Sequence, residues 1–176
     1  MSPSLVLPAL APLTLMPLTE RDLCELIAAP EAFATRHALI IEAGACAPNF
    51  IYERALANLQ LAPAWADLLG TRLYVLEGQR VVGSGGAKAP PSAEGEVEVE
   101  IGYGMAPAWQ GRGLGTQAAR ALTEEALAHG AQRVSACTRP DNIASWRLLE
   151  RIGFVRDGER ADPQDGMLWR WVRERG

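Results

Sequence analysis

Hydrophobic and polar residues alternate most regularly over residues 96–103. One face of this segment collects Val97, Val99, Ile101 and Tyr103, and the other collects Glu96, Glu98, Glu100 and Gly102. A period of two residues is typical of a β-strand with one buried face. Because Pro107 has no amide hydrogen to give to a sheet, we expect this strand to end within Met105–Trp109.

Shorter apolar runs bounded by turn-forming residues predict the other strands. They cover Leu13–Pro17, Arg72–Glu77, Arg80–Gly86, Arg133–Thr138, Phe154–Arg156 and Met167–Arg173. Only Gly78 and Gln79 separate the second and third runs, and this spacing predicts an antiparallel hairpin. The stretch Pro90–Gly95 is predicted to be a loop from its composition.

Capping residues and helical periodicity predict the helices. Thr19 and Asp22 resemble a capping box at the start of a helix that runs to about Ile27. The other expected helices cover Phe50–Gln60 behind Asn49, the segment from Leu114 to Gly130, and the segment from Asp141 or Asn142 to about Arg151.

Strands that alternate with helices around a hairpin predict a single α/β domain with a mixed sheet. Because the sequence contains no internal repeat and no linker long enough to divide domains, this domain is expected to span residues 13–176. Residues 1–12 are apolar but contain Pro3, Pro8 and Pro12 and no basic residue, so we expect a flexible or extended segment rather than a signal peptide. The sequence also lacks an apolar run long enough to cross a membrane.

Charge and cysteine content narrow the functional classes. A net charge of −4 argues against nucleic acid as the main partner. Cys24, Cys46 and Cys137 lie far apart, without the spacing of a metal site, so we expect no metal and a reducing, cytoplasmic location.

Three alternating glycines lie in the segment Gln110-Gly-Arg-Gly-Leu-Gly115, between the predicted strand and the predicted helix. Without side chains, their backbone amides and the positive end of the helix dipole can converge on an anion. The segment lacks the Lys-Ser/Thr ending of a P-loop, and Thr116 replaces the third glycine of a dinucleotide fingerprint. An ordinary left-handed turn is the alternative that these residues leave open.

The same segment resembles the Q/R-x-x-G-x-G/A signature of the GNAT superfamily of N-acyltransferases. Met105-Ala-Pro107 is similar to the hydrophobic-x-Pro step that ends the fourth strand of that family. The resemblance implies a twisted sheet that splays beside the signature and binds acetyl-CoA as co-substrate. It also implies pantetheine contacts with the backbone of Met105 and pyrophosphate contacts with Gln110, Gly111, Arg112, Gly113, Leu114, Gly115 and Thr116.

A second motif runs from Asn142 to Phe154. It resembles the N-x-x-S-x-R-x-L-E-x-x-G-F helix of the GNAT subgroup that acetylates the N-termini of ribosomal proteins. Leu149 stands where many relatives outside that subgroup carry an acidic tyrosine, which favours the subgroup with serine. The resemblance adds Asn142 and Arg147 to the implied cofactor contacts. Together the two motifs cover roughly a third of the chain.

Glu100 and Ser145 are the candidate catalytic residues. Because a protonated amine has no lone pair, a carboxylate at the splayed end of the strand could accept its proton. A solvated carboxylate is the alternative, and it is our interpretation of Glu96 and Glu98. Ser145 lies on an inward helical stripe, and the resemblance implies that it hydrogen-bonds the departing sulfur. A bond to a carbonyl one turn earlier is the alternative for this serine.

Three further side chains receive structural interpretations. Trp169 and Trp171 share a strand face and are assigned to the core or to a subunit interface, which leaves a homodimer open. Cys137 is assigned to the core as a small hydrophobic residue rather than to an acyl-carrying nucleophile.

The sequence therefore predicts a cytoplasmic acetyl-CoA-dependent N-acetyltransferase that acts on a primary amine. The resemblance suggests a peptide N-terminus, including that of a ribosomal protein. Polyamines, amino acids and antibiotics remain alternative acceptors, and the acidic strand face is expected to suit a cationic amine. Two rivals come from other classes: a non-catalytic acyl-CoA-binding sensor, and a nucleotide-binding module that uses the same glycine loop.

Overall fold

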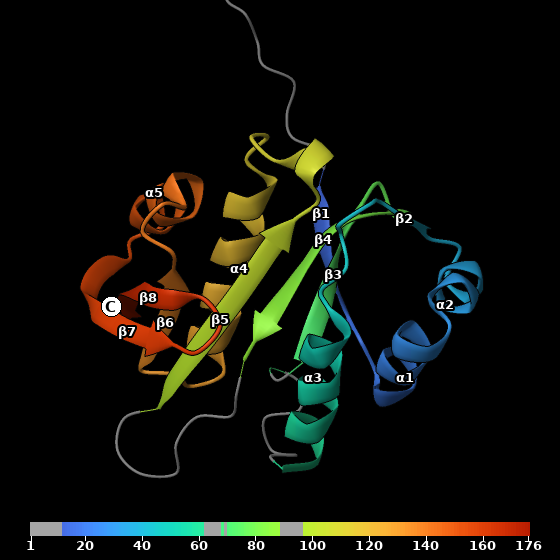
Figure 1. Ribbon diagram of the computed structural model, residues 1–176, viewed down its shortest axis with the longest axis horizontal. Helices are drawn as coiled ribbons and strands as arrows, with labels where there is room; N and C mark the ends of the chain where they lie inside the picture. The colour runs from blue at the N-terminus through green and yellow to red at the C-terminus, as the bar shows by residue number, and fades with distance from the viewer. Residues whose placement is uncertain (1–11, 62–67, 69, 89–96) are drawn as a thin grey trace, which may run out of the picture.

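The computed structural model describes residues 12–61, 68, 70–88 and 97–176. The predicted loop Pro90–Gly95, Glu96 and residues 1–11 of the N-terminal segment lie outside the described residues. The described part is an eight-stranded mixed sheet flanked by helices, so the predicted α/β class is confirmed (Figure 1).

The sheet has the strand order β1-β3-β4-β5-β6-β8-β7, and β2 pairs with β4. The strands are β1 (Leu13–Pro17), β2 (Ile40–Ile41), β3 (Gly70–Leu76), β4 (Arg80–Ala87), β5 (Glu98–Met105), β6 (Arg133–Thr138), β7 (Val155–Asp162) and β8 (Gly166–Glu174). The helices are α1 (Glu20–Ala28), α2 (Pro30–Arg36), α3 (Asn49–Leu61), α4 (Leu114–Ala128) and α5 (Ile143–Arg151), with the short 3-10 helix η2 at Pro107–Trp109.

Most predicted elements are confirmed, including the antiparallel β3–β4 hairpin and the end of β5 at Met105. The short helix α2 and the strand β2 were not predicted. The strand predicted at Phe154–Arg156 is too short, because β7 continues to Asp162. Most of β7 is exposed and polar, and its backbone ladder with β8 holds it in place rather than an apolar face.

The sheet splays between β5 and β6. These two strands are parallel, and they pair only where Glu98, Val99 and Glu100 lie beside Arg133, Val134 and Ser135. The remainder of β5, from Ile101 to Met105, still pairs with β4 but not with β6. Within the described ranges, one edge of this end of β5 is therefore left without a strand partner, as the sequence resemblance implied.

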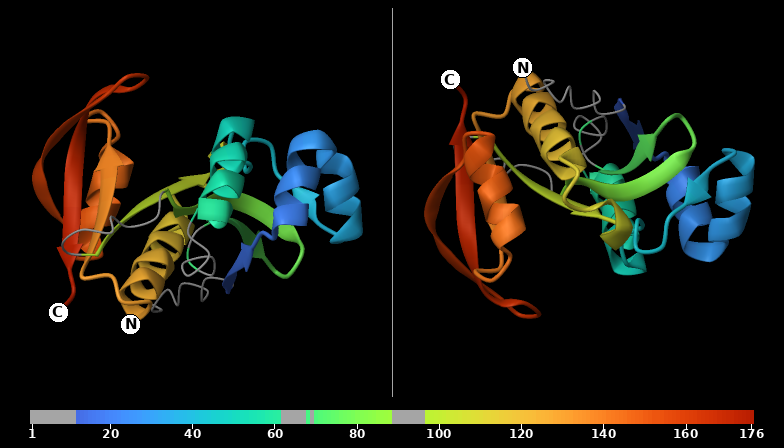
Figure 2. Two further views of the ribbon diagram at one scale, coloured as in Figure 1. Left: turned by 90° about the horizontal axis from the view of Figure 1, so that it is seen from below. Right: turned by 90° about the horizontal axis from the view of Figure 1, so that it is seen from above.

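Two apolar clusters hold the helices on opposite faces of the sheet. Helix α4 packs on one face, with Leu114 and Leu122 buried against β5 and its neighbours, and α3 packs on the other face (Figure 2). The second cluster joins α1, α2 and α3 through the fully buried Leu23, Phe33 and Tyr52. The splayed end of β5 thus lies between two helical layers that the core fixes in place.

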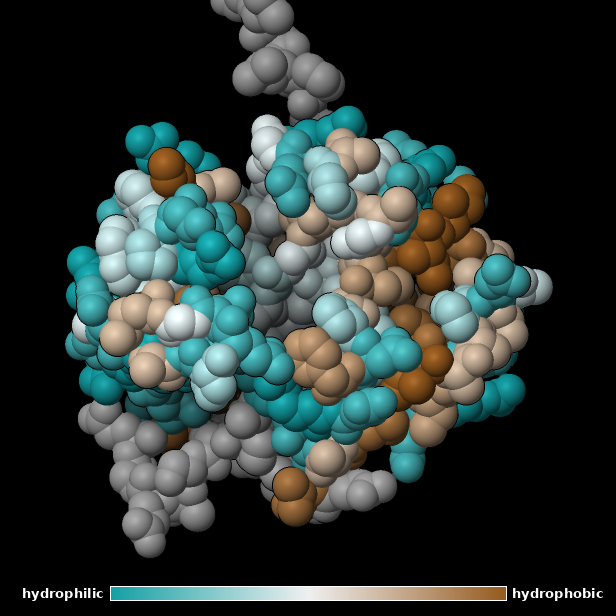
Figure 3. All heavy atoms as spheres, viewed as in Figure 1, coloured by the Kyte–Doolittle hydropathy of each residue, from teal (hydrophilic) through white to brown (hydrophobic). Residues whose placement is uncertain are grey.

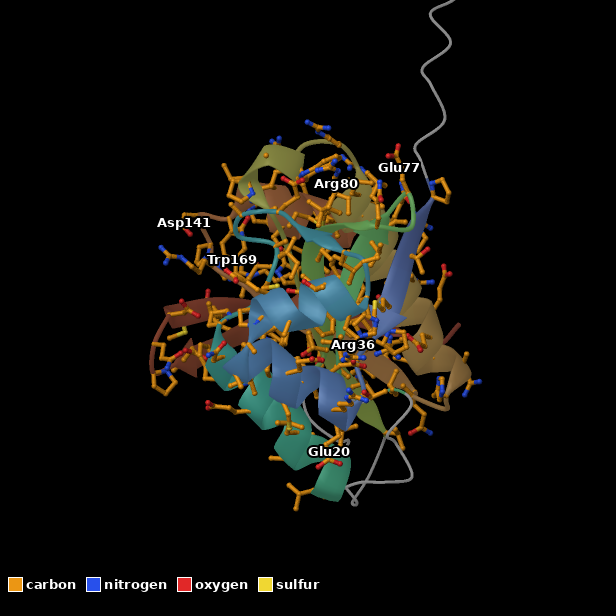
Figure 4. The ribbon with its side chains drawn as sticks, turned by 90° about the vertical axis from the view of Figure 1, so that its right-hand side faces the viewer. Glu20, Arg36, Glu77, Arg80, Asp141 and Trp169 are labelled. Carbon is orange, nitrogen blue, oxygen red and sulfur yellow. The ribbon has the colours of Figure 1, made fainter. Side chains whose placement is uncertain are left out.

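The first helix is anchored by the predicted capping box. Thr19 Oγ1 accepts a hydrogen bond from the amide of Asp22, and the Asp22 carboxylate accepts one from the Thr19 amide at 2.9 Å. Arg36 of α2 points toward α1 and pairs with Asp22, which also contacts His37 (Figure 4). Burial opposes ionisation of Asp22, but the bonds from Thr19, Arg36 and His37 prevail and lower its pKa below the ordinary value.

Candidate active site

The splay opens into a cavity of about 480 Å³. Its walls come from the loop at residues 44–48, α3, the ends of β4, β5 and β6, the start of α5 and the β7–β8 hairpin. Figure 3 shows the hollow between the two lobes of this face. Met105, Tyr103 and Ser145 line it together with the charged side chains of Arg54, Lys88 and Asp162, which form its polar chamber.

The backbone of β5 presents polar groups to this opening. The amide of Ala106 donates to Val82 of β4, and the carbonyl of Glu100 accepts from Lys88. Because backbone groups alternate in direction along a strand, the amides of Tyr103 and Met105 point away from β4 and into the splay. The Met105 carbonyl points the same way, because it accepts a bond from Gln110 Nε2 at 3.2 Å.

The glycine loop leaves the N-terminus of α4 open to an anion. Gly111 and Gly113 have φ angles of 73° and 77°, a left-handed region that favours glycine. Gly113 is the N-cap of α4 and supplies no side-chain cap, so the first amides of the helix have no capping side chain. Gly115 lies beside Leu148 and Met105, and a Cβ there would make ordinary van der Waals contacts with them at 3.4 and 3.5 Å.

The remaining residues of the first motif surround this N-terminus. Leu114 is buried in the core and Thr116 is half-buried. The exposed Arg112 guanidinium lies 4.5 Å from the centre of the Trp109 ring. Arg112 is thus a cation held beside the loop by an aromatic face rather than by an acidic partner.

A second hollow, of about 440 Å³, continues from the loop along α4. Gly113, Thr116 and Gln117 line it near the start of α4, and Arg120, Arg151 and the acidic Glu124 line it as well. Among the described residues, neither of these exposed arginines has an ion-pair partner. The sequence did not identify these two arginines as candidate anion-binding residues, because their proximity to each other depends on the packing of α4 against α5.

Asn142 and Ser145 are both at the start of α5. Of the two predicted capping residues, Asn142 is the N-cap, and its Oδ1 accepts a hydrogen bond from the amide of Ser145 at 3.1 Å. The Ser145 hydroxyl lies 3.0 Å from the phenol oxygen of Tyr103, so its contact in the structure is a long-range one rather than a bond within its own helix. Arg147 is exposed, with its guanidinium 5.5 Å from the centre of the Trp146 ring.

Glu100 is held between two cations. Its carboxylate lies 2.7 Å from Lys88 Nζ and 2.7 Å from Arg160 Nη1. Burial by itself would raise the pKa of Glu100, but the hydrogen bonds and charges of Arg160 and Lys88 lower it below the ordinary value. The carboxylate is therefore ionised at neutral pH, and its charge is compensated within the protein.

The interpretation of Glu98 as a solvated side chain is wrong. Both of its carboxylate oxygens accept bonds from Arg170 Nη2, at 2.7 and 2.8 Å, and only 32% of the side chain is exposed. Burial opposes ionisation, but Ser135 and Arg170 lower the pKa of Glu98. Since Glu98 and Glu100 are both paired, the described part of this strand face does not offer the free acidic surface expected for a cationic amine.

Trp171 belongs to the core, as one of the two assignments predicted, whereas Trp169 is only partly buried and packs against the same cluster. Trp171 is buried, its Nε1 donates to Thr138 at 2.9 Å, and its ring is stacked with Trp146.

Cys137 is less enclosed than expected, because it is only half-buried and lines the main cavity. Burial raises the pKa of its thiol, which does not favour the thiolate that a nucleophile requires.

Two further properties concern metals and membranes. In the described ranges, no group of three or more His, Cys, Asp or Glu residues is placed to hold a metal ion. None of the helices in these ranges is long and apolar enough to span a bilayer.

Comparison with known proteins assigns this fold and loop to a family. Residues 12–155 match the acetyltransferase (GNAT) domain, and the chain therefore belongs to the GNAT acetyltransferase family. One curated relative is the mycothiol acetyltransferase of Geodermatophilus obscurus, which is 40% identical over 106 residues. This match covers 56% of the chain but only 33% of the relative, so the chain spans about a third of that protein.

Solved structures agree with the fold over nearly the whole chain. The ribosomal-protein-S5-alanine acetyltransferase of Vibrio fischeri superposes with a TM-score of 0.63 at 17% identity, covering 92% of this chain and 91% of that one. An aminoglycoside acetyltransferase in complex with coenzyme A gives a TM-score of 0.61 at 22% identity, with 93% and 95% covered. At these identities the likeness concerns the fold alone.

Proposed function

We propose that this protein transfers an acetyl group from acetyl-CoA to a primary amine by direct attack within a ternary complex. One observation carries the proposal: the edge of β5 that has no strand partner among the described residues lines the cavity and ends at Met105, beside Gly115 in the first turn of the uncapped helix α4. Membership of the GNAT family supports it, as does the coenzyme A bound by a structural neighbour. The same arrangement disfavours a nucleotide-binding module, because an extended thioester arm needs the strand edge whereas a nucleotide phosphate needs only the loop.

The cofactor's phosphates would bind around the start of α4. The pyrophosphate would accept hydrogen bonds from the amides of residues 110–116, with Arg112 beside it. Asn142 and Arg147 would contact the cofactor from α5. The cofactor's 3′-phosphate would extend into the hollow beyond the loop, where Arg120 and Arg151 supply two cations against the single carboxylate of Glu124.

The pantetheine arm would continue along the splay. Its amides would pair with the free edge of β5 in the manner of an added strand. The Met105 amide, which points into the splay, would then polarise the thioester carbonyl. This arrangement would bring the thioester near Ser145, which lines the same cavity.

The chemistry needs a proton acceptor and a stabilised leaving group. In the proposed reaction the amine nitrogen bonds to the acetyl carbon, the C–S bond breaks, and its electron pair goes to sulfur. The amine proton passes through water to Glu100, and Ser145 donates a hydrogen bond to the sulfur. The lowered pKa makes Glu100 a weaker base than an unpaired glutamate, so its assistance is limited to a transient role in proton transfer.

The acceptor would enter through the polar chamber of the main cavity. We favour a peptide N-terminus, which the serine-containing α5 motif suggests. A small amine such as a polyamine, an amino acid or an antibiotic is the alternative. Because Glu98 and Glu100 are already paired, recognition would depend on other groups that line the chamber, including the exposed Arg54 and Asp165.

A thiol-release assay tests this function directly. Acetyl-CoA is incubated with the protein and a panel of N-terminal peptides, polyamines, amino acids and aminoglycosides, and free thiol is measured with mass analysis of the products. We expect amine-dependent thiol release with at least one class. Tight acetyl-CoA binding by calorimetry without turnover on any amine would instead favour the acyl-CoA sensor, and preferential binding of ATP would favour the nucleotide module.

A further inference from the structure

Tyr103 contributes a second hydroxyl to the proposed reaction centre. Its phenol oxygen lies 3.0 Å from Ser145 Oγ, although 42 residues separate the two in the sequence. Both residues line the main cavity together with Met105. The contact crosses from β5 to α5, so it links the two elements that would hold the thioester between them.

The backbone holds Tyr103 rigidly in this position. Tyr103 pairs with Gly85 of β4, and a Cβ on Gly85 would lie 2.7 Å from the Tyr103 Cα. This close approach requires glycine at position 85 and leaves the Tyr103 backbone little freedom to move. Asn142 positions Ser145, the other residue of this contact, because it caps the helix turn that carries Ser145.

The chemistry of the two hydroxyl groups decides which one donates. Burial raises the pKa of Tyr103 to about 12, so the phenol keeps its proton throughout the neutral range. A phenol is a stronger acid than the aliphatic alcohol of serine and is the better donor. A serine oxygen can accept one hydrogen bond while donating its own proton elsewhere.

We infer that Tyr103 is a positioning residue, whose O–H donates to Ser145 Oγ and thereby turns the serine proton toward the departing sulfur of the thioester. This inference rests on the proposed function, because it concerns the orientation of the Ser145 hydroxyl in the same reaction. No proton is transferred from Tyr103. The tyrosine prevents Ser145 from rotating back to a carbonyl of its own helix, a bond that a serine in a helix otherwise forms.

The test is a double-mutant cycle with a matched control. The variants are Tyr103→Phe, Ser145→Ala and the double variant, and the control is Tyr74→Phe. Tyr74 is a second buried tyrosine, and its hydroxyl has no hydrogen-bond partner among the residues that the structure describes. Single-turnover acetyl transfer, the acetyl-CoA dissociation constant and the melting temperature are measured for each.

We expect Tyr103→Phe to slow acetyl transfer about three- to tenfold with an unchanged dissociation constant. In the Ser145→Ala background the same change should cost less than about twofold, because its target is gone. Tyr74→Phe should react at the wild-type rate. Independent, multiplicative losses in the double variant, or a wild-type rate for Tyr103→Phe, would overturn the inference.

The outcomes also separate the inference from the function on which it rests. Absence of transfer by the wild-type protein to any amine would contradict the proposed function itself. Full activity of Ser145→Ala would remove the role of Ser145 and that of Tyr103 with it. A slow Ser145→Ala variant beside a fully active Tyr103→Phe variant would leave the function intact and reject only the positioning role.

Discussion

Gly111 and Gly78 allow the proposed cofactor loop to be tested with a matched pair of variants. Their φ angles are 73° and 76°, and a Cβ at either position would have no heavy atom within 4 Å. Gly111 lies in the loop before α4, whereas Gly78 lies in the β3–β4 turn. Substitution by alanine therefore introduces the same backbone strain at both positions, and only Gly111→Ala also alters the proposed anion site.

The expected magnitudes follow from this geometry. A left-handed alanine costs about 1–2 kcal/mol, which at this chain length corresponds to a fall in melting temperature of roughly 2–8 °C. In Gly111→Ala the loop amides also lose their alignment on the pyrophosphate. A hydrogen bond to a charged group contributes about 1.5–3 kcal/mol, and the exposed position argues for the lower end. We therefore expect acetyl-CoA binding to weaken about tenfold, equivalent to about 1.4 kcal/mol.

The assay is isothermal titration calorimetry with acetyl-CoA, combined with melting curves for both variants. The expected result is a similar loss of stability in the two proteins and a loss of affinity in Gly111→Ala alone. If both variants melt early and both bind acetyl-CoA as the wild type does, the loop is an ordinary left-handed turn. If Gly78→Ala also loses affinity, general destabilisation rather than the loop explains the effect.

Four further predictions use other parts of the site and the fold. Glu100→Gln should lower kcat most severely at low pH, where free amine is scarce, and alkaline pH should partly restore kcat. A pH–rate profile identical to that of the wild type would exclude Glu100 as a proton acceptor. Ser145→Ala should reduce kcat about tenfold while the acetyl-CoA dissociation constant stays nearly unchanged, whereas equal activity would leave the thiolate to be protonated by solvent. Replacing Arg120 and Arg151 together by alanine should weaken binding of acetyl-CoA severalfold but leave acetyl-dephospho-CoA unaffected, and an equal loss for both ligands would refute a 3′-phosphate contact. Asp22 has a lowered pKa in the folded state, so its contribution to stability is present above its unfolded pKa, about 3.9, and is lost as pH falls through the lower folded pKa. Urea unfolding should accordingly show a smaller loss of stability at acidic pH in Asp22→Asn than in the wild type.

The sequence by itself determined the features that depend on neighbouring residues. The alternation over residues 96–103 predicted the strand β5, and Pro107 predicted its end. The capping residues Thr19 and Asn142 marked the starts of α1 and α5 correctly, because a cap involves groups only two or three residues apart. The glycines before α4 were identifiable for the same reason, since a left-handed backbone is a local requirement.

Only the tertiary structure decided which side chains meet in the site. Glu98 and Glu100 have the same place in the alternating pattern of the sequence. Their pairing with Arg170 and Arg160 depends on how β7 and β8 lie beside the parallel strands β5 and β6, which pair only at the start of β5. The length of β7 was missed because its ladder with β8, and not an apolar pattern, holds it. In the sequence, Tyr103 was interpreted only as one of the apolar positions of the alternating pattern. Its hydroxyl reaches Ser145 because the splay brings β5 and α5 together around one cavity, and no local pattern encodes a contact between residues that distant in the chain.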